Sequence, residues 1–147
     1  MPRVVVLEGR ALPGIDPARV WALVADLTRL PEWFPVHSSG AMTTEAPAVG
    51  HAFFFTLRKG SDPSKGLTLR VAEWEAGARY ACEIAGTALV DEGRFEVAVA
   101  GVPHLGADTR LTLRFSGEAS RWMAPVVQMD VRRRFRKALD RLEKALR

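Results

Sequence analysis

The chain has 147 residues, the length of one domain with a core of its own. Hydrophobic residues make up 48% of the sequence and charged residues 26%, which excludes extended disorder as its main state. No apolar run approaches the ~20 residues that a membrane-spanning helix needs. The N-terminal apolar run is also shorter than the core of a secretory signal, so we expect a cytoplasmic protein.

The sequence offers little to bind a metal or a cofactor. Cys82 is the only cysteine, so no internal disulfide can form. The three histidines do not combine with it at the spacing of a zinc site. No phosphate-binding glycine loop or hydrolase motif is present, so we expect neither a metal nor a cofactor.

The first third of the chain predicts a strand and two short helices. A β-branched run indicates a strand over residues 1–12. Asp16 and Pro17 then mark a helix start, because Asp caps free N–H groups and Pro suits the first helical position. Asp26 opens a second short turn through Leu30. Apolar residues recur at helical spacing through this region: Val20, Leu23, Val24 and Leu27.

An aromatic elbow follows the helices. Pro31 and Pro35 bracket Glu32, Trp33 and Phe34, and we expect regular structure to stop there. The two aromatic residues have two interpretations, as a cover over a bound ligand or as an elbow packed against a sheet.

Apolar and polar residues alternate through the middle of the chain. This period of two predicts an antiparallel sheet with one buried and one wet face. Turn residues divide it into the expected strands, over residues 51–59, 67–75, 79–85, 89–100 and 109–117.

The C-terminal region predicts one long amphipathic helix after Ser120. Its apolar stripe is Val127, Val131, Phe135, Ala138, Leu142 and Ala145. Pro125 either lies in the first turn or kinks the helix. The basic run Arg132–Lys137 is either the solvated side of this helix or a surface for a polyanion.

The dimensions of these elements predict a gap between sheet and helix. A helix of about 25 residues is roughly 37 Å long, and six or seven strands span about 30 Å. A twisted sheet meets a straight helix closely over only part of its length. Either a ligand or large side chains must fill the remaining gap, and the sequence leaves both alternatives open. The residues expected to bind a ligand are Trp33, Phe34, Phe53, Phe55, Leu69, Val71, Tyr80, Cys82, Phe95, Val127 and Val131.

Two segments resemble the opening of the START/Bet v 1-like (SRPBCC) superfamily: Arg19–Leu27 (RVWALVADL) and Leu30–Pro35 (LPEWFP). Within it, the chain resembles the polyketide cyclase/dehydrase and lipid-transport branch. Val71–Glu75 is similar to that branch's mid-sheet segment, and Gly106–Leu113 to its Gly-Thr-Arg strand start, although two residues separate the Gly from the Thr.

The resemblance implies an α+β helix-grip fold as one domain over residues 1–147. A curved antiparallel sheet of six to seven strands would wrap around the C-terminal helix, with two short helices after the first strand. Members of the superfamily bind lipids, quinones or polyketides in the cavity, and some are cyclases or aromatases. We therefore expect a protein that binds a hydrophobic or amphipathic small molecule, as a monomer or homodimer, with no strong case for nucleic acid.

Two alternatives remain open. The first is a cyclase or aromatase, whose candidate catalytic residues would be Glu73, Tyr80 and His37. Glu73 points inward if its strand is regular, and toward solvent if it follows the nearby turn. Cys82 is interpreted as a small buried hydrophobic residue. The second alternative is an interaction protein that uses the basic C-terminal helix.

Overall fold

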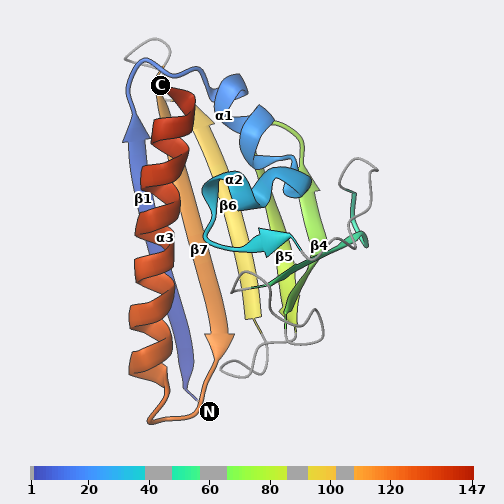
Figure 1. Ribbon diagram of the computed structural model, residues 1–147, viewed down its shortest axis with the longest axis vertical. Helices are drawn as coiled ribbons and strands as arrows, with labels where there is room; N and C mark the ends of the chain where they lie inside the picture. Colours follow the sequence, from blue (N-terminus) through green and yellow to red (C-terminus); the bar gives the residue numbers. More distant parts are fainter. Residues whose placement is uncertain (1, 39–47, 57–65, 86–92, 102–107) are drawn as a thin grey trace.

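The computed structural model describes residues 2–38, 48–56, 66–85, 93–101 and 108–147 (Figure 1). In chain order the elements are β1 (Arg3–Leu12), α1 (Pro17–Val24), the 3₁₀ helix η1 (Leu27–Arg29), α2 (Leu30–Trp33), β2 (His37–Ser38), β3 (Ala52–Thr56), β4 (Leu67–Glu75), β5 (Arg79–Ala85), β6 (Gly93–Gly101), β7 (Thr109–Glu118) and α3 (Ala124–Leu146).

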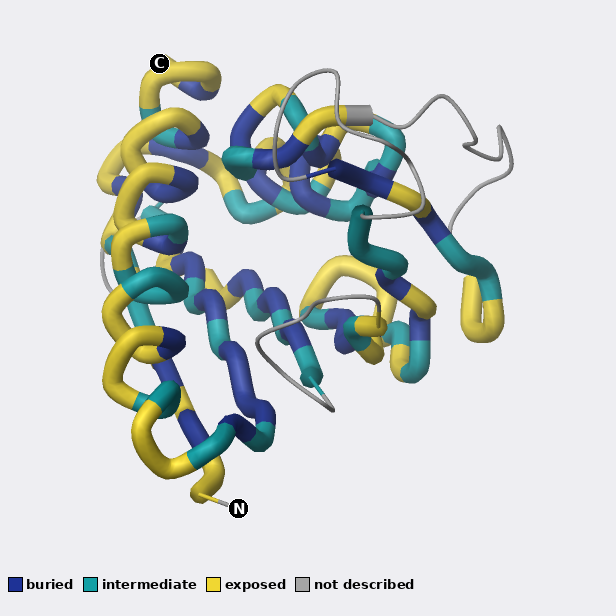
Figure 2. Tube along the Cα trace, turned by 60° about the horizontal axis from the view of Figure 1, so that its bottom comes forward, coloured by how far each residue is buried: buried dark blue, intermediate teal, exposed yellow. Residues whose placement is uncertain are grey.

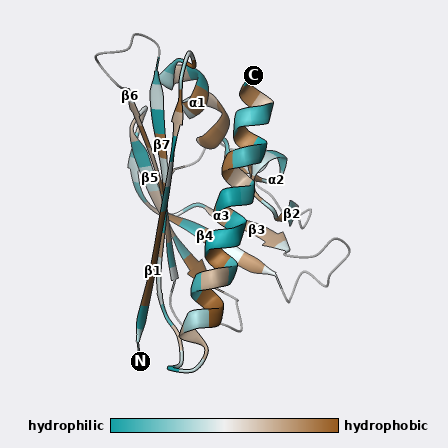
Figure 3. Cartoon of the chain, turned by 90° about the vertical axis from the view of Figure 1, so that its left-hand side faces the viewer, coloured by the Kyte–Doolittle hydropathy of each residue, from teal (hydrophilic) through white to brown (hydrophobic). Residues whose placement is uncertain are grey.

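The seven strands form one antiparallel sheet in the order β1-β7-β6-β5-β4-β3-β2. β1 pairs with the last strand, β7, in a register that runs from Arg3 opposite Glu118 to Leu12 opposite Thr109. α3 lies against β1 and β7, whereas α1 lies against β6 and β7 (Figures 1 and 3). This arrangement confirms the expected α+β helix-grip fold.

Side-chain caps set the start of the N-terminal helices. The carboxylate of Asp16 accepts a hydrogen bond of 2.8 Å from the Ala18 N–H, and Asp26 accepts one of 3.1 Å from the Thr28 N–H. The helix predicted at Asp16 and the short turn predicted at Asp26 are therefore both confirmed.

The expectation that regular structure stops between the two prolines is wrong. α2 covers Leu30–Trp33 and includes Pro31 in its first turn, where the missing N–H of proline costs no helical hydrogen bond. The helix ends at Trp33, and the backbone of the next residue, Phe34, is extended.

α3 runs from Ala124 with Pro125 in its first turn, which answers the question about a kink. The residues of α3 coloured as buried lie on the side of the helix that faces the sheet (Figure 2). Ala145 is exposed, and Leu146 is buried in its place.

Parts of two predicted strands are not tested, and one short strand was not predicted. β3 ends at Thr56 and β6 begins at Gly93, so the predicted strand residues 57–59 and 89–92 lie outside the described residues. β2 has only two residues, which is too short to show a period in the sequence.

A β-bulge in β4 has the largest consequence for the site. Val71 pairs with Cys82 and Glu73 with Ala81, so Ala72 is an extra residue without a partner of its own. An extra residue shifts every following side chain to the opposite face. Glu73 is therefore exposed, and Trp74 turns toward the core.

Candidate functional site

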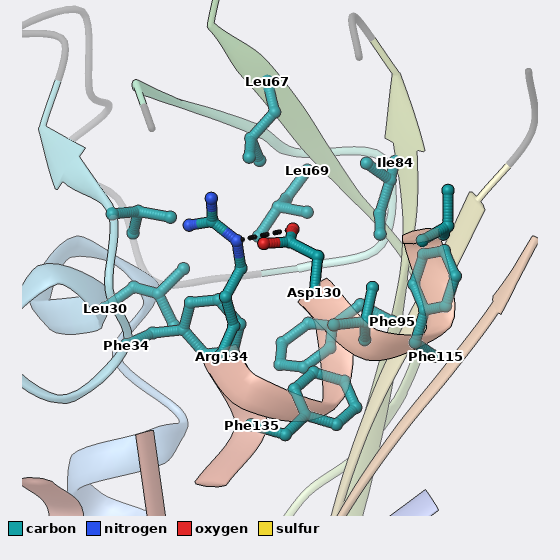
Figure 4. A pocket seen from close by; sticks show the side chains of 13 residues that line it. Leu30, Phe34, Leu67, Leu69, Ile84, Phe95, Phe115, Asp130, Arg134 and Phe135 are labelled. Atoms are coloured by element: carbon teal, nitrogen blue, oxygen red, sulfur yellow. Dashed lines mark hydrogen bonds and ion pairs between the residues drawn. The ribbon is translucent and has the colours of Figure 1, made fainter. Parts of the chain in front are cut away.

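An apolar cavity of about 120 Å³ lies between the N-terminal half of α3 and the sheet. For scale, an apolar cavity of about 150 Å³ can hold benzene, whereas drug-sized ligands occupy about 300–1,000 Å³. In this conformation the cavity therefore has about the volume needed for a single aromatic ring. Its lining is Leu30, Phe34, Val36, Leu67, Leu69, Ile84, Phe95, Phe115, Val127, Asp130, Val131, Arg134 and Phe135 (Figure 4).

Three phenyl rings from different parts of the fold meet at this cavity. Phe34 of the elbow lies 5.5 Å from Phe95 of β6 and 6.0 Å from Phe135 of α3, measured between ring centroids. Phe95 and Phe135 are 5.9 Å apart. These are distances of favourable edge-to-face and tilted contacts. The elbow, the sheet and the long helix are thus fixed relative to one another by one aromatic cluster.

An ion pair interrupts the apolar lining. The Nε of Arg134 donates to Oδ2 of Asp130 at 3.0 Å, four residues earlier on α3. Each of these two side chains is 27% exposed. Arg134 also donates from Nη1 to the Pro35 carbonyl at 3.4 Å, which connects the helix to the elbow. Figure 4 shows the two charged side chains turned toward each other among the apolar residues of the lining.

The structure places part of the expected ligand-binding set at this cavity. The expected residues that line it are Phe34, Leu69, Phe95, Val127 and Val131. The expected residues that are buried elsewhere in the core are Trp33, Phe53, Phe55, Val71, Tyr80 and Cys82. A ligand contact for any of them stays a prediction.

Sequence reasoning missed the charged pair. It treated Arg132–Lys137 as a single basic run, although Arg134 follows Val127 and Val131 at helical spacing and so shares their side of α3. This helical spacing could have shown from the sequence that Arg134 lies on the side of α3 that faces the cavity. The other lining residues absent from the expected set are Leu30, Val36, Leu67, Ile84, Phe115, Asp130 and Phe135.

Three aromatic rings pack against one another beneath α1. Tyr80 stacks on Trp74 at 5.2 Å between ring centroids, and Trp21 meets Trp74 edge-on at 5.4 Å. The Tyr80 hydroxyl donates to the Val24 carbonyl at 2.7 Å. Burial raises the pKa of Tyr80 well above its usual value, so the phenol stays neutral. Its position makes it a structural hydrogen-bond donor.

Cys82 lies in the same packed interior. Burial raises the pKa of its thiol to about 12, against an opposing influence of the Arg94 charge. A thiol with this pKa is almost entirely protonated at neutral pH and is a poor nucleophile. The interpretation of Cys82 as a small hydrophobic residue therefore agrees with its surroundings.

The other two catalytic candidates are exposed and absent from the lining of the cavity. Glu73 lies on the outer face of the sheet, where its Oε2 accepts hydrogen bonds from Arg79 at 2.6 Å and from Arg94 at 2.5 Å. Of the two alternatives for Glu73, inward or toward solvent, the structure shows the second, because the bulge at Ala72 turns its side chain away from the face of Leu69. His37 is exposed on the edge strand β2.

Most of the basic run is paired within the chain. Arg132 and Arg136 each lie 3.4 Å from Oε1 of Glu8 on β1. Arg133 donates to Oδ1 of Asp130 at 2.8 Å, on the opposite carboxylate oxygen from Arg134. These contacts fit a solvated helix side that is held to the edge of the sheet. An interaction with a polyanion stays a prediction.

Residues 7–147 match the family model described as polyketide cyclase / dehydrase and lipid transport. The chain belongs to this family. Its membership confirms the resemblance to the START/Bet v 1-like superfamily that Arg19–Leu27 and Leu30–Pro35 indicated. No curated protein sequence matches the chain.

Solved structures share the fold at low sequence identity. XoxI from Bacillus cereus is 12% identical, with 97% of this chain and 95% of that chain covered, at a TM-score of 0.76. Norcoclaurine synthase from Thalictrum flavum, in complex with dopamine and hydroxybenzaldehyde, is 12% identical over 98% of this chain and 86% of that chain, with a TM-score of 0.73. Ara h 8.0201 is 12% identical over 99% and 98%, with a TM-score of 0.71.

Two other kinds of site are absent from the part of the chain that the structure describes. None of its helices is long and apolar enough to cross a membrane. No group of three or more His, Cys, Asp or Glu side chains there is arranged to hold a metal ion.

Proposed function

We propose that the protein binds a small hydrophobic or amphipathic molecule, such as a lipid, a quinone or a polyketide-like compound, in the cavity against α3. The observation that carries this proposal is the composition of the wall, in which eleven of thirteen lining residues are apolar. Ligand sites commonly combine such a wall with one or two polar groups that fix orientation.

The energetics of an apolar cavity favour occupancy. Side chains that face a void lose the dispersion contacts they would make in a filled core. A ligand restores those contacts and removes its own apolar surface from water, at about 25 cal/mol for each Å² buried. A solved structure of this fold in complex with dopamine and hydroxybenzaldehyde adds support for small-molecule binding.

Binding has more support than catalysis. Of the three candidate catalytic residues, Glu73 and His37 are exposed, and the hydroxyl of Tyr80 is already bonded to Val24. None of them belongs to the lining of the cavity. The alternative of a cyclase or aromatase is therefore supported only by membership of the family. The cytoplasmic location and the monomeric or dimeric state also stay predictions.

The test is to fill the cavity with a side chain. Val131 lines the cavity, whereas Val126 is 45% exposed on the same helix and is absent from the lining. We expect 3-phenylpropan-1-ol, a one-ring neutral probe, to shift amide signals of the lining in ¹⁵N-resolved NMR titrations. Val131→Trp should weaken this binding at least about tenfold, because overpacking removes the space for the ring.

Val126→Trp is the matched control and should bind the probe as the wild type does. Thermal unfolding of both variants checks that they are folded. Equal binding of the probe by Val126→Trp and Val131→Trp would overturn the proposed function.

A further inference from the structure

Asp130 and Arg134 are the two charged residues of the described lining. A simple explanation is that they form an ordinary helix pair four residues apart, which stabilises α3 slightly. That explanation accounts for one donor of Arg134. It leaves open why a guanidinium lies at the wall of an apolar cavity.

The guanidinium of Arg134 has donor capacity left. Its Nε is bonded to Asp130, and its Nη1 makes a long contact of 3.4 Å with the Pro35 carbonyl. Among the described residues, its Nη2 has no hydrogen-bond partner. A guanidinium presents its donors as a planar fork that matches the two oxygens of a carboxylate or phosphate.

The local charge balance also favours an anion. One carboxylate, that of Asp130, is shared between the guanidinium groups of Arg133 and Arg134. Asp130 therefore neutralises Arg134 only in part, although solvent screens the competing charge of Arg133, whose side chain is 76% exposed. Among the described residues, the lining contains no other charged side chain.

We propose that the ligand of this cavity is an amphipathic acid, with an apolar body against the phenylalanine cluster and an oxyanion, carboxylate or phosphate, on Arg134. This inference rests on the proposed function and adds the chemical class of the ligand. The apolar part supplies burial, and Arg134 sets the orientation and selects acids over neutral or basic compounds of the same size.

Four probes that share a phenylpropyl body and differ in their heads test this selection: 3-phenylpropanoate, 3-phenylpropyl phosphate, 3-phenylpropan-1-ol and 3-phenylpropylamine. Dissociation constants are measured by NMR titration at a pH where the acids are ionised. We expect at least one of the two acids to bind about tenfold more tightly than the alcohol, which is the usual gain of a charge-assisted hydrogen bond. The amine should bind most weakly.

Arg134→Gln should remove this preference, so that the acid binds no more tightly than the alcohol. Arg134→Lys keeps the charge without the fork and should retain part of the preference. Arg133→Gln is the matched control. It removes an equal charge from the same Asp130 but lies outside the lining, and its exposed position predicts a change below about threefold.

The results separate this inference from the function on which it rests. Equal binding of acids and alcohol by the wild type would overturn the inference and leave the proposed function standing. An equal loss of acid preference in Arg133→Gln and Arg134→Gln would also overturn it, because the general positive field would then explain the selectivity. Failure of all four probes to bind, with Val131→Trp indistinguishable from the wild type, would instead overturn the proposed function. A preference for one acid over the other identifies the head group.

Discussion

The space between the helices and the sheet is packed with side chains in one region and contains a cavity in another. Beneath α1 it is filled by Trp21, Trp74 and Tyr80, which contact one another ring to ring. Beneath the N-terminal half of α3 a cavity of about 120 Å³ remains beside Phe34 and Phe135. Both regions are built from aromatic side chains, so aromatic content alone does not decide whether this fold is hollow.

The difference follows from where the side chains point and how their polar atoms are satisfied. The bulge at Ala72 turns Trp74 inward, where it adds a large ring to the packed region. The Tyr80 hydroxyl then bonds to Val24 and holds α1 against the sheet. In the cavity region the charged groups are Asp130 and Arg134, and Nη2 of Arg134 has no hydrogen-bond partner among the described residues. In the packed region the Tyr80 hydroxyl has a hydrogen-bond partner and holds α1 in place. At the cavity, the guanidinium of Arg134 has donors left for a ligand.

The largest expected effect comes from truncating one aromatic residue in each region. Tyr80→Ala should lower the free energy of unfolding by about 4 kcal/mol, because it leaves a void in a fully packed core. Phe34→Ala should cost about 1–2 kcal/mol, since its ring is partly buried and already borders a cavity. Urea unfolding measures both values. Equal losses would show that the two regions do not differ in packing.

A second prediction removes only the polar anchor of the packed region. Tyr80→Phe keeps the ring and leaves the Val24 carbonyl without its donor, which should cost about 1–2 kcal/mol in the free energy of unfolding. Binding of 3-phenylpropan-1-ol should stay at the wild-type level if the two regions act independently. A large loss of binding in this variant would show that α1 and the cavity are coupled.

The fold was predictable because its signals are periodic or local. The alternation over residues 109–117 and the caps at Asp16 and Asp26 each indicate an element from neighbouring residues. The long helix follows from its apolar stripe. One-turn α2 and two-residue β2 are too short to show a period, so the sequence did not indicate them.

The site was less predictable, because it depends on irregular features and on distances between elements. Regular alternation would point Glu73 inward, and the sequence left this open against a position facing solvent; the extra residue Ala72 decides for solvent. No sequence pattern marks such a bulge here. The sequence also could not show whether the gap between sheet and helix is open or filled by side chains. Phe95 at the cavity and Phe53 in the packed core both follow the same alternating strand pattern.

The smallest expected effect comes from the outer face of the sheet. It tests whether residues there also influence the contrast between the packed region and the cavity. On the outer face, Glu96 accepts hydrogen bonds from Arg94 and Arg114, both at 3.0 Å. Partial burial raises the pKa of Glu96, but the hydrogen bonds from the two arginines outweigh it and the pKa is lowered. A carboxyl whose pKa is lowered by folding stabilises the protein above its unfolded pKa of about 4.3. This contribution is lost as the pH falls through the lower pKa of the folded state.

Glu96→Gln should therefore lower the free energy of unfolding by less than about 1 kcal/mol at pH 7, since the network is partly exposed. The difference from the wild type should shrink as the pH falls below about 4, because the wild-type carboxyl is then also becoming neutral. Urea unfolding as a function of pH measures this change. Probe binding at pH 7 should be the same in both proteins, because Glu96 lies across the sheet from the cavity. A loss of probe binding in Glu96→Gln would mean that the outer ion pairs help to set the shape of the sheet, and the contrast between filled and hollow regions would then have a cause on both faces.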